Sequence, residues 1–154
     1  MARNTGVVGW MLRGAAAGAA GTTALNVVTY LDMAVRGRPA STTPERTLEK
    51  LAATAHVTVP GEGPTRANRV EGLGALTGLV SGIGVGGLLG LARASGLRTG
   101  TLLTTLVVLV STNGPMTVLG ITDPRTWSRT DWLSDLVPHF AYGVVVTTTL
   151  DALG

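Results

Sequence analysis

The residues from Gly72 to Ala92 form an uncharged, mostly apolar run that is long enough for a helix to cross a lipid bilayer. Within this run glycine recurs at every fourth position, at Gly74, Gly78, Gly82, Gly86 and Gly90. Glycine weakens a helix in water by about 1 kcal/mol per residue, whereas in lipid a stripe of small residues lets a neighbouring backbone approach closely. We therefore predict an integral membrane protein with this helix as its packing centre.

The composition supports a membrane protein and argues against several other classes. Only 14% of the 154 residues are charged and 45% are hydrophobic, whereas about a quarter of a soluble domain is charged. The chain contains no cysteine, which excludes disulfides and thiolate metal ligands. The 12 basic residues are scattered through the chain and do not form a stripe with interleaved aromatic residues, so we predict no nucleic-acid binding.

The apolar runs predict an all-α fold in a single membrane domain spanning residues 1–154. We expect a bundle of four transmembrane helices at about residues 8–34, 72–94, 100–121 and 131–153. The long polar segment after the first span contains an amphipathic stretch at about 43–54, which predicts a short interfacial helix. Arg13 interrupts the first apolar run, so we interpret this run as a retained span and not as a cleaved signal peptide.

Small residues also mark the first span, and a break is expected in the third. Gly14 and Gly18 lie one helical turn apart and form the natural partner face for the glycine stripe. In the third span Pro115 follows Asn113 and Gly114, and a proline removes one backbone hydrogen bond of a helix. We therefore expect this helix to be interrupted in its middle.

Polar residues at similar depth suggest a site within the bundle. Asp131, Asp135, His139 and Tyr142 follow one another at helical spacing and share one face of the fourth span. Counting residues along the other spans places further polar groups in the same leaflet. The candidate binding or pathway residues are Asn26, Asp32, Asn113, Asp135, His139 and Tyr142. The alternative is that these groups only hydrogen-bond neighbouring helices together.

Two classes of function remain open on this evidence. The first is a small transport or channel-like module, in which the polar cluster lines a path for a proton, an ion or a small solute. The second is a non-catalytic accessory or scaffold subunit of a larger membrane complex. An enzyme is the third choice, because one intramembrane histidine with carboxylates falls short of a three-ligand metal set. We predict no bound metal and no cofactor.

Contacts with other molecules are also expected from the sequence. The chain should contact the lipid bilayer along its spans. Glycines also lie away from the main stripe, at Gly72, Gly84 and Gly87, which predicts packing against a second helix. We therefore expect a homo-oligomer, with a dimer favoured, or a different membrane protein as partner.

The C-terminal half resembles the YagU-like bacterial inner-membrane proteins. The resemblance rests on the segment from Pro115 to Pro124, on Trp127, and on the groups Leu133-Ser134-Asp135 and His139-Phe140-Ala141-Tyr142-Gly143. The small-residue first span, from Gly14 to Thr22, fits the same pattern. The resemblance implies a multi-spanning protein of the bacterial plasma membrane and adds weight to His139. The family is linked to acid resistance in broad terms, and the resemblance supplies no mechanism.

Overall fold

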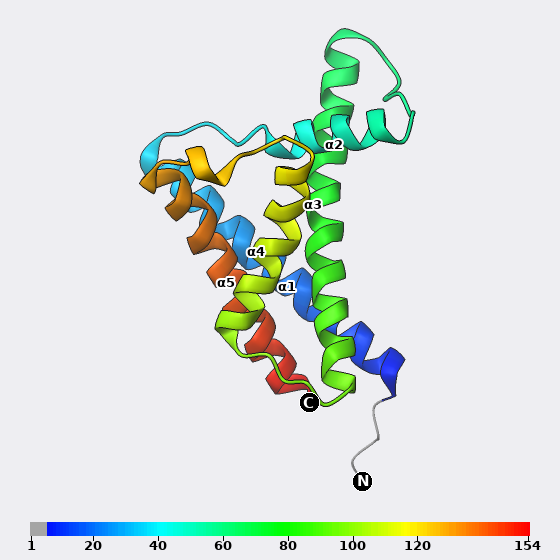
Figure 1. Cartoon of the computed structure of the whole chain (residues 1–154), viewed down its shortest axis with the longest axis vertical. Coiled ribbons are helices and arrows are strands. Elements are labelled where there is room, and N and C mark those ends of the chain that lie inside the picture. The colour runs from blue at the N-terminus through cyan, green and yellow to red at the C-terminus, as the bar shows by residue number, and fades with distance from the viewer. Residues whose placement is uncertain (1–5) are drawn as a thin grey trace.

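The computed structural model describes residues 6–154, which form helices joined by turns and loops, with no β-strand (Figure 1). The all-α prediction is therefore confirmed for this part of the chain. The helices are α1 (Val7–Arg36), α2 (Thr43–Thr54), α3 (Gly63–Ala94), α4 (Thr101–Val118) and α5 (Arg129–Leu153), with a 3-10 turn, η1 (Pro124–Thr126), before α5.

The architecture is built around α1, which packs chiefly against α3 and α5. In Figure 1 α1 and α5 incline together, α3 crosses α1, and α4 lies on α5. The short helix α2 lies across the upper part of α3, where a side chain at Gly74 would meet the backbone of Pro44 and Glu45. The N-terminal end of α1 and the C-terminal ends of α3 and α5 lie at the same end of the molecule.

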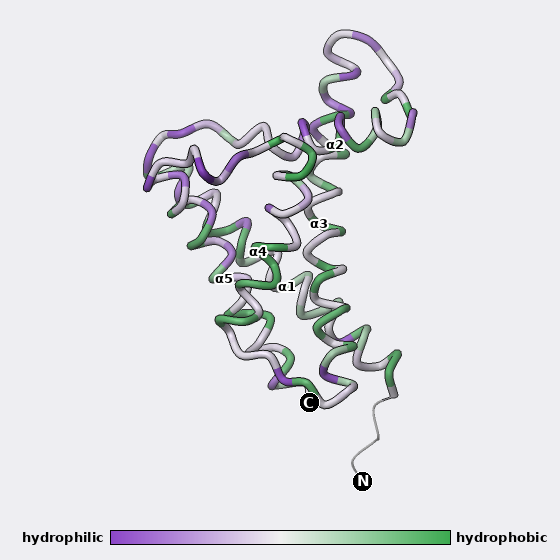
Figure 2. The backbone as a smooth tube through the Cα atoms, in the orientation of Figure 1, coloured by the Kyte–Doolittle hydropathy of each residue, from purple (hydrophilic) through white to green (hydrophobic). Residues whose placement is uncertain are grey.

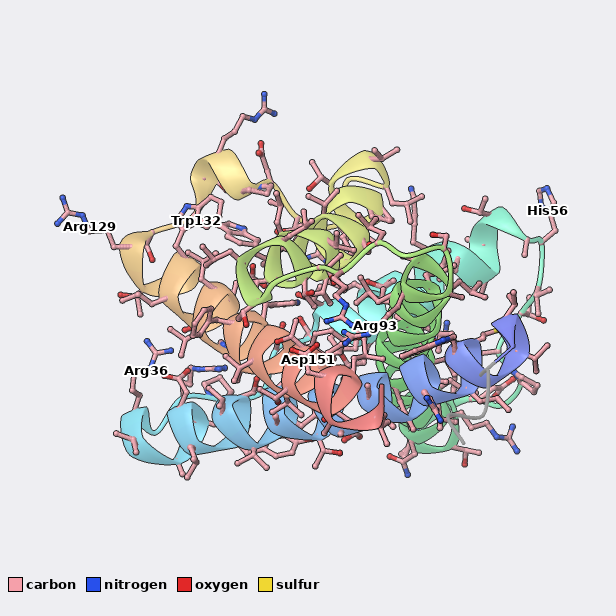
Figure 3. All side chains as sticks on the ribbon, turned by 90° about the horizontal axis from the view of Figure 1, so that it is seen from below. Arg36, His56, Arg93, Arg129, Trp132 and Asp151 are labelled. Carbon is pink, nitrogen blue, oxygen red and sulfur yellow. The ribbon has the colours of Figure 1, made fainter. Side chains whose placement is uncertain are left out.

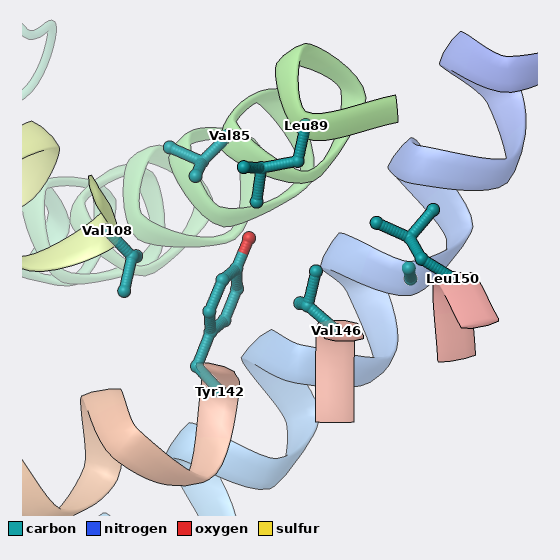
Figure 4. Close-up of a cluster of buried hydrophobic side chains, with 7 residues drawn as sticks. Val85, Leu89, Val108, Tyr142, Val146 and Leu150 are labelled. Atoms are coloured by element: carbon teal, nitrogen blue, oxygen red, sulfur yellow. The ribbon is translucent and has the colours of Figure 1, made fainter. Parts of the chain in front are cut away.

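A small apolar core fills the space between these helices. Its buried members come from every long helix (Figure 4): Ala17, Val85, Leu89, Val108, Tyr142, Val146 and Leu150. Tyr142 on α5 points its phenol toward α3, where its hydroxyl donates a hydrogen bond of 2.7 Å to the carbonyl of Gly82. Most other large apolar side chains face outward, as expected for helices surrounded by lipid.

Within residues 6–154, three helices are long and apolar enough to cross a membrane, namely α3, α4 and α5. The expectation of four such spans is therefore met only in part. With 30 residues α1 is long enough, but its alanine, glycine and threonine leave it without a membrane-length segment as apolar as those of the other three helices. Figure 2 shows hydrophilic residues concentrated at the end of the molecule that carries α2 and η1.

Two helix boundaries differ from those predicted by the hydropathy pattern. Helix α3 begins at Gly63, well before the expected start at residue 72, because polar contacts extend it beyond the apolar run. Arg66 forms a 2.9 Å ion pair with Glu49 of α2, and Arg69 donates a hydrogen bond to the carbonyl of Pro60. Helix α4 ends at Val118, before the expected boundary at residue 121.

The expected interruption of α4 was wrong, because the helix continues through Asn113, Gly114 and Pro115. Pro115 lies close to the end of the helix, where only one short turn follows it. The carbonyl of Pro115 still accepts the backbone N–H of Leu119 at 2.9 Å. A single missing hydrogen bond near a helix end can therefore be accommodated without breaking the helix.

Candidate functional site

A polar cluster joins α4 to α5 within the bundle. The amide Nδ2 of Asn113 donates a hydrogen bond to Asp135 Oδ2 at 2.8 Å. One turn further along α5, the Nε2 of His139 lies 3.2 Å from the hydroxyl of Thr112. These two contacts link neighbouring residues of α4 to residues four apart on α5, so the cluster fixes how the two helices face each other.

The ring of His139 is hydrogen-bonded through both nitrogen atoms. Its Nδ1 lies 2.7 Å from the carbonyl oxygen of Asp135, and because a carbonyl only accepts, Nδ1 must carry the proton. The same Nδ1 is 3.4 Å from the carboxylate Oδ1 of Asp135. His139 is only 9% exposed, so these partners account for the polar atoms of a nearly buried ring.

Thr112 allows the histidine to be held in two protonation states. In the neutral ring Nε2 is an acceptor, and the hydroxyl of Thr112 donates to it. In the charged ring Nε2 donates to the Thr112 oxygen, and the hydroxyl proton turns to the carbonyl of Val108, which lies 2.9 Å away. The carboxylate of Asp135 then faces the charged ring.

The candidate residues predicted from the sequence do not all meet in this cluster. Asn113, Asp135 and His139 come together, whereas Asn26 is exposed on α1. Tyr142 is fully buried and binds α3 through its hydroxyl. Thr112 was not predicted, because α4 contains several threonines at helical spacing and nothing in the sequence distinguishes this one.

Asp32 belongs to a separate group of charges at the C-terminal end of α1. Its carboxylate oxygens lie 2.7 Å from Arg36 Nε and 2.6 Å from Arg38 Nε. Arg36 also donates a 2.7 Å hydrogen bond from Nη2 to the hydroxyl of Ser134 on α5. A cleft of about 230 Å³ lies between the two helices at this level, lined by Val28, Asp32, Arg36, Thr130, Leu133, Ser134, Val137 and Pro138.

Arginines at the opposite end of the bundle tie three helices together. Arg93 of α3 forms a 2.6 Å ion pair with Asp151 of α5, and the two side chains lie close together in Figure 3. The indole of Trp10 on α1 lies beside two guanidinium groups. The centroid of its ring is 5.2 Å from Cζ of Arg13 and 5.5 Å from Cζ of Arg93. Such cation–π contacts favour a fixed position of the tryptophan at this end.

Glycines make the crossing of α1 and α3. A Cβ at Gly14 would collide with the carbonyl of Gly86 and lie 2.8 Å from the Cα of Gly90. A Cβ at Gly18 would lie 2.6 Å from the carbonyl of Gly82. Gly74 lies against α2 and not α1. Gly78 lies on α3 between the contact with α2 and the contact with α1, and a Cβ there would have nothing within 4 Å.

No group of three or more histidine, cysteine, aspartate or glutamate side chains that could hold a metal ion occurs within residues 6–154. The polar cluster therefore offers hydrogen bonds and one histidine–carboxylate pair as its chemistry.

Comparison with known proteins finds no matching family model, no matching curated protein and no matching solved structure. The resemblance to YagU-like proteins stays a prediction.

Proposed function

We propose that the chain crosses the membrane four times, with α1 as the fourth span. At about 1.5 Å per residue, the 30 residues of α1 extend for about 45 Å, which exceeds the hydrocarbon thickness of a bilayer. The segment from Gly14 to Leu31 carries no charged residue. Its charges lie near the two ends, at Arg13 and from Asp32 onward, where they can reach the headgroups.

We further propose that the protein is a non-catalytic accessory or scaffold subunit of the membrane. The observation that carries this proposal is that the polar groups of the cluster already have hydrogen-bond partners within the protein. Nε2 of His139 and the amide of Asn113 are used in contacts between α4 and α5, and Nδ1 of His139 is used within α5, by the carbonyl of Asp135. The cleft between α1 and α5 and the cleft beside α2 are both lined by other residues. A polar group that already has its partners stabilises a helix pair and needs no solute.

Uncovered small residues on α3 support a second membrane-embedded chain as partner. Gly72 and Gly84 have nothing within 4 Å, and the apolar side chains of Leu76 and Val80, which lie between them on the same face of α3, are exposed. Glycine inside a helix is unfavourable unless a neighbour uses the space. A second copy of the chain, forming a dimer, is the simplest such neighbour. Native mass measurement in a mild detergent that gives only monomer would refute the dimer.

The accessory role is tested by two substitutions with opposite expectations. His139→Ala should leave the amount of folded protein in the membrane and its oligomeric state nearly unchanged, because it removes one contact between α4 and α5. Gly82→Leu should disrupt the crossing of α1 and α3, since any Cβ at Gly82 collides with Thr22. Flux of protons or ions through the purified protein in liposomes, abolished by His139→Ala, would overturn the accessory role.

A transport or channel-like module is the second candidate, favoured by the two arrangements open to Thr112 and His139. A histidine that can be held charged or neutral by the same partners is suited to passing a proton. The test is a proton-flux measurement in liposomes with a trapped pH-sensitive dye. Transport predicts that Thr112→Val slows the flux and that Thr112→Ser restores it, because serine keeps the hydroxyl.

The resemblance to YagU-like proteins supports a location in the bacterial plasma membrane. Expression in a bacterial host followed by separation of inner and outer membranes tests this location. Recovery in the outer-membrane or soluble fraction would contradict it.

A further inference from the structure

The cleft between the C-terminal end of α1 and the N-terminal end of α5 changes in character along its length. Because the two helices run in opposite directions, Arg36 lies level with Ser134, to which it is hydrogen-bonded, and Val28 lies deeper. The eight residue-to-residue steps from Val28 to Arg36 cover about 12 Å of helix. The lining is apolar at the deep end, with Val28, Val137 and Pro138, and polar at the shallow end, with Asp32, Arg36 and Thr130.

The surroundings place this cleft at the edge of the hydrocarbon region. Leu133 in its wall is 60% exposed, and Leu31, the chain neighbour of Asp32 on α1, is 59% exposed. Trp127 and Trp132 pack edge to face at the same end of α5, with ring centroids 5.0 Å apart. Tryptophans of this kind mark the headgroup level of a bilayer, so the polar end of the cleft faces headgroups and the apolar end faces acyl chains.

A guanidinium edge at the shallow end can bind an anionic group. Two arginines, Arg36 and Arg38, share the carboxylate of Asp32, and the carboxylate of Asp131, which caps the start of α5, also attracts Arg36. Arg36 uses Nε and Nη2 for Asp32 and Ser134, and its Nη1 donates no hydrogen bond to any residue from 6 to 154. The side chain of Arg36 is 34% exposed, so this free edge of the guanidinium is accessible to a phosphate.

We propose that the α1–α5 cleft binds one glycerophospholipid, with the phosphodiester at the free edge of Arg36 and the start of one acyl chain against Val28 and Val137. The volume of about 230 Å³ equals about eight water-sized volumes of ~30 Å³ each, which accommodates part of a chain and not a whole lipid. Basic pockets between transmembrane helices bind lipid headgroups in this manner. The phosphodiester shared by phosphatidylglycerol and phosphatidylethanolamine is the group that the free edge of Arg36 recognises.

Native mass spectrometry of the full chain in detergent, titrated with dioleoyl lipids, tests this proposal. Each wild-type chain should bind one lipid, and its affinities for phosphatidylglycerol and phosphatidylethanolamine should be similar. Dioleoylglycerol, which has the same chains and no phosphate, should bind about tenfold more weakly or worse. Inorganic phosphate should not displace the lipid, because it lacks the acyl chain. Equal binding of dioleoylglycerol, or displacement by phosphate, would overturn the proposal.

Matched variants separate the cleft from the general surface. Arg36→Gln removes the charge and Val28→Phe fills the apolar end, and each should weaken lipid binding by about tenfold. Arg129→Gln removes an exposed arginine of α5 that points away from the bundle (Figure 3), and Val27→Phe enlarges an exposed neighbour outside the cleft. These two controls should change the affinity by less than about twofold. The same loss in all four variants, or a loss in none, would refute the site.

A second copy of the chain is the alternative occupant, and a crosslink decides between the two. Val28→Cys in the otherwise cysteine-free chain should form no disulfide-linked dimer under oxidation if a lipid fills the cleft. Efficient formation of a Val28→Cys disulfide dimer would assign the cleft to a second copy and contradict the lipid.

Discussion

Replacing Gly86 by alanine adds a single methyl group at the point where α3 meets α1. The added Cβ would collide with the carbonyl of Gly14 and lie 2.5 Å from the Cα of Gly18 and 2.7 Å from its backbone nitrogen. All three of these atoms belong to the backbone, so no side chain can rotate away to make room. The two helices must move apart instead.

The size of the effect follows from this displacement. Carbon atoms in favourable contact are about 3.5–4.0 Å apart, so α1 and α3 must separate by about 1 Å at their crossing. Overpacking of this kind costs about 1–3 kcal/mol. Gly78→Ala is the matched control, because a Cβ at Gly78 has nothing within 4 Å. The control should be neutral or up to about 1 kcal/mol more stable than the wild type, since alanine favours a helix more than glycine does.

Reversible unfolding in mixed micelles with a rising fraction of dodecyl sulfate measures both variants. Circular dichroism follows the helix content, and tryptophan fluorescence follows the crossing, because the carbonyl of Trp10 lies where a Cβ at Gly90 would be. Gly86→Ala should unfold at a lower detergent fraction than the wild type, and Gly78→Ala should not. If the two alanine variants unfold at the same point, close packing at the crossing does not stabilise the protein.

Three further predictions concern single contacts. Tyr142→Phe removes the buried hydrogen bond from the phenol to α3, and the same unfolding assay should show a loss of about 1 kcal/mol. Ser128→Ala removes the capping box with Asp131 and should destabilise the start of α5 by about 1 kcal/mol, seen as faster amide exchange confined to the first turn. The guanidinium and backbone N–H of Arg125 lower the pKa of Asp123, in the connection before α5, below its usual 3.8. The contact therefore stabilises the loop above pH 3.8 and is lost as the pH falls through the lower folded value. In Arg125→Ala, carboxyl NMR should show the pKa of Asp123 rising toward 3.8, and an unchanged pKa would rule out the contact.

Much of the helical architecture could be predicted from the sequence, because apolar runs of sufficient length have few alternatives to helices. The extension of α3 to Gly63 could not be predicted from hydropathy, since it depends on polar contacts such as that between Arg66 and Glu49. The continuity of α4 through Pro115 depends on how close the proline lies to a helix end.

The candidate site was predicted less completely, for a geometric reason. Counting residues along a helix gives the depth of Asn26, Asn113 and His139, but it does not give the rotation of each helix about its own axis. The pair Asn113 and Asp135 meet because α4 and α5 face each other there, whereas Asn26 faces outward from α1. Rotation is set by packing at other positions, such as the glycines of α1 and α3, and those contacts connect distant parts of the chain.

The glycine crossing also limits how the sequence can change. In an ordinary core, a larger residue on one helix can be compensated by a smaller one on its partner. At this crossing a Cβ added at Gly14, Gly18, Gly86 or Gly90 would lie closest to backbone atoms of the opposite helix, so no side chain there can be made smaller. Every substitution at these positions adds volume, and no substitution on the opposite helix can remove any. A second mutation that rescues a damaged crossing must therefore act from elsewhere, by shifting one helix along or around the other.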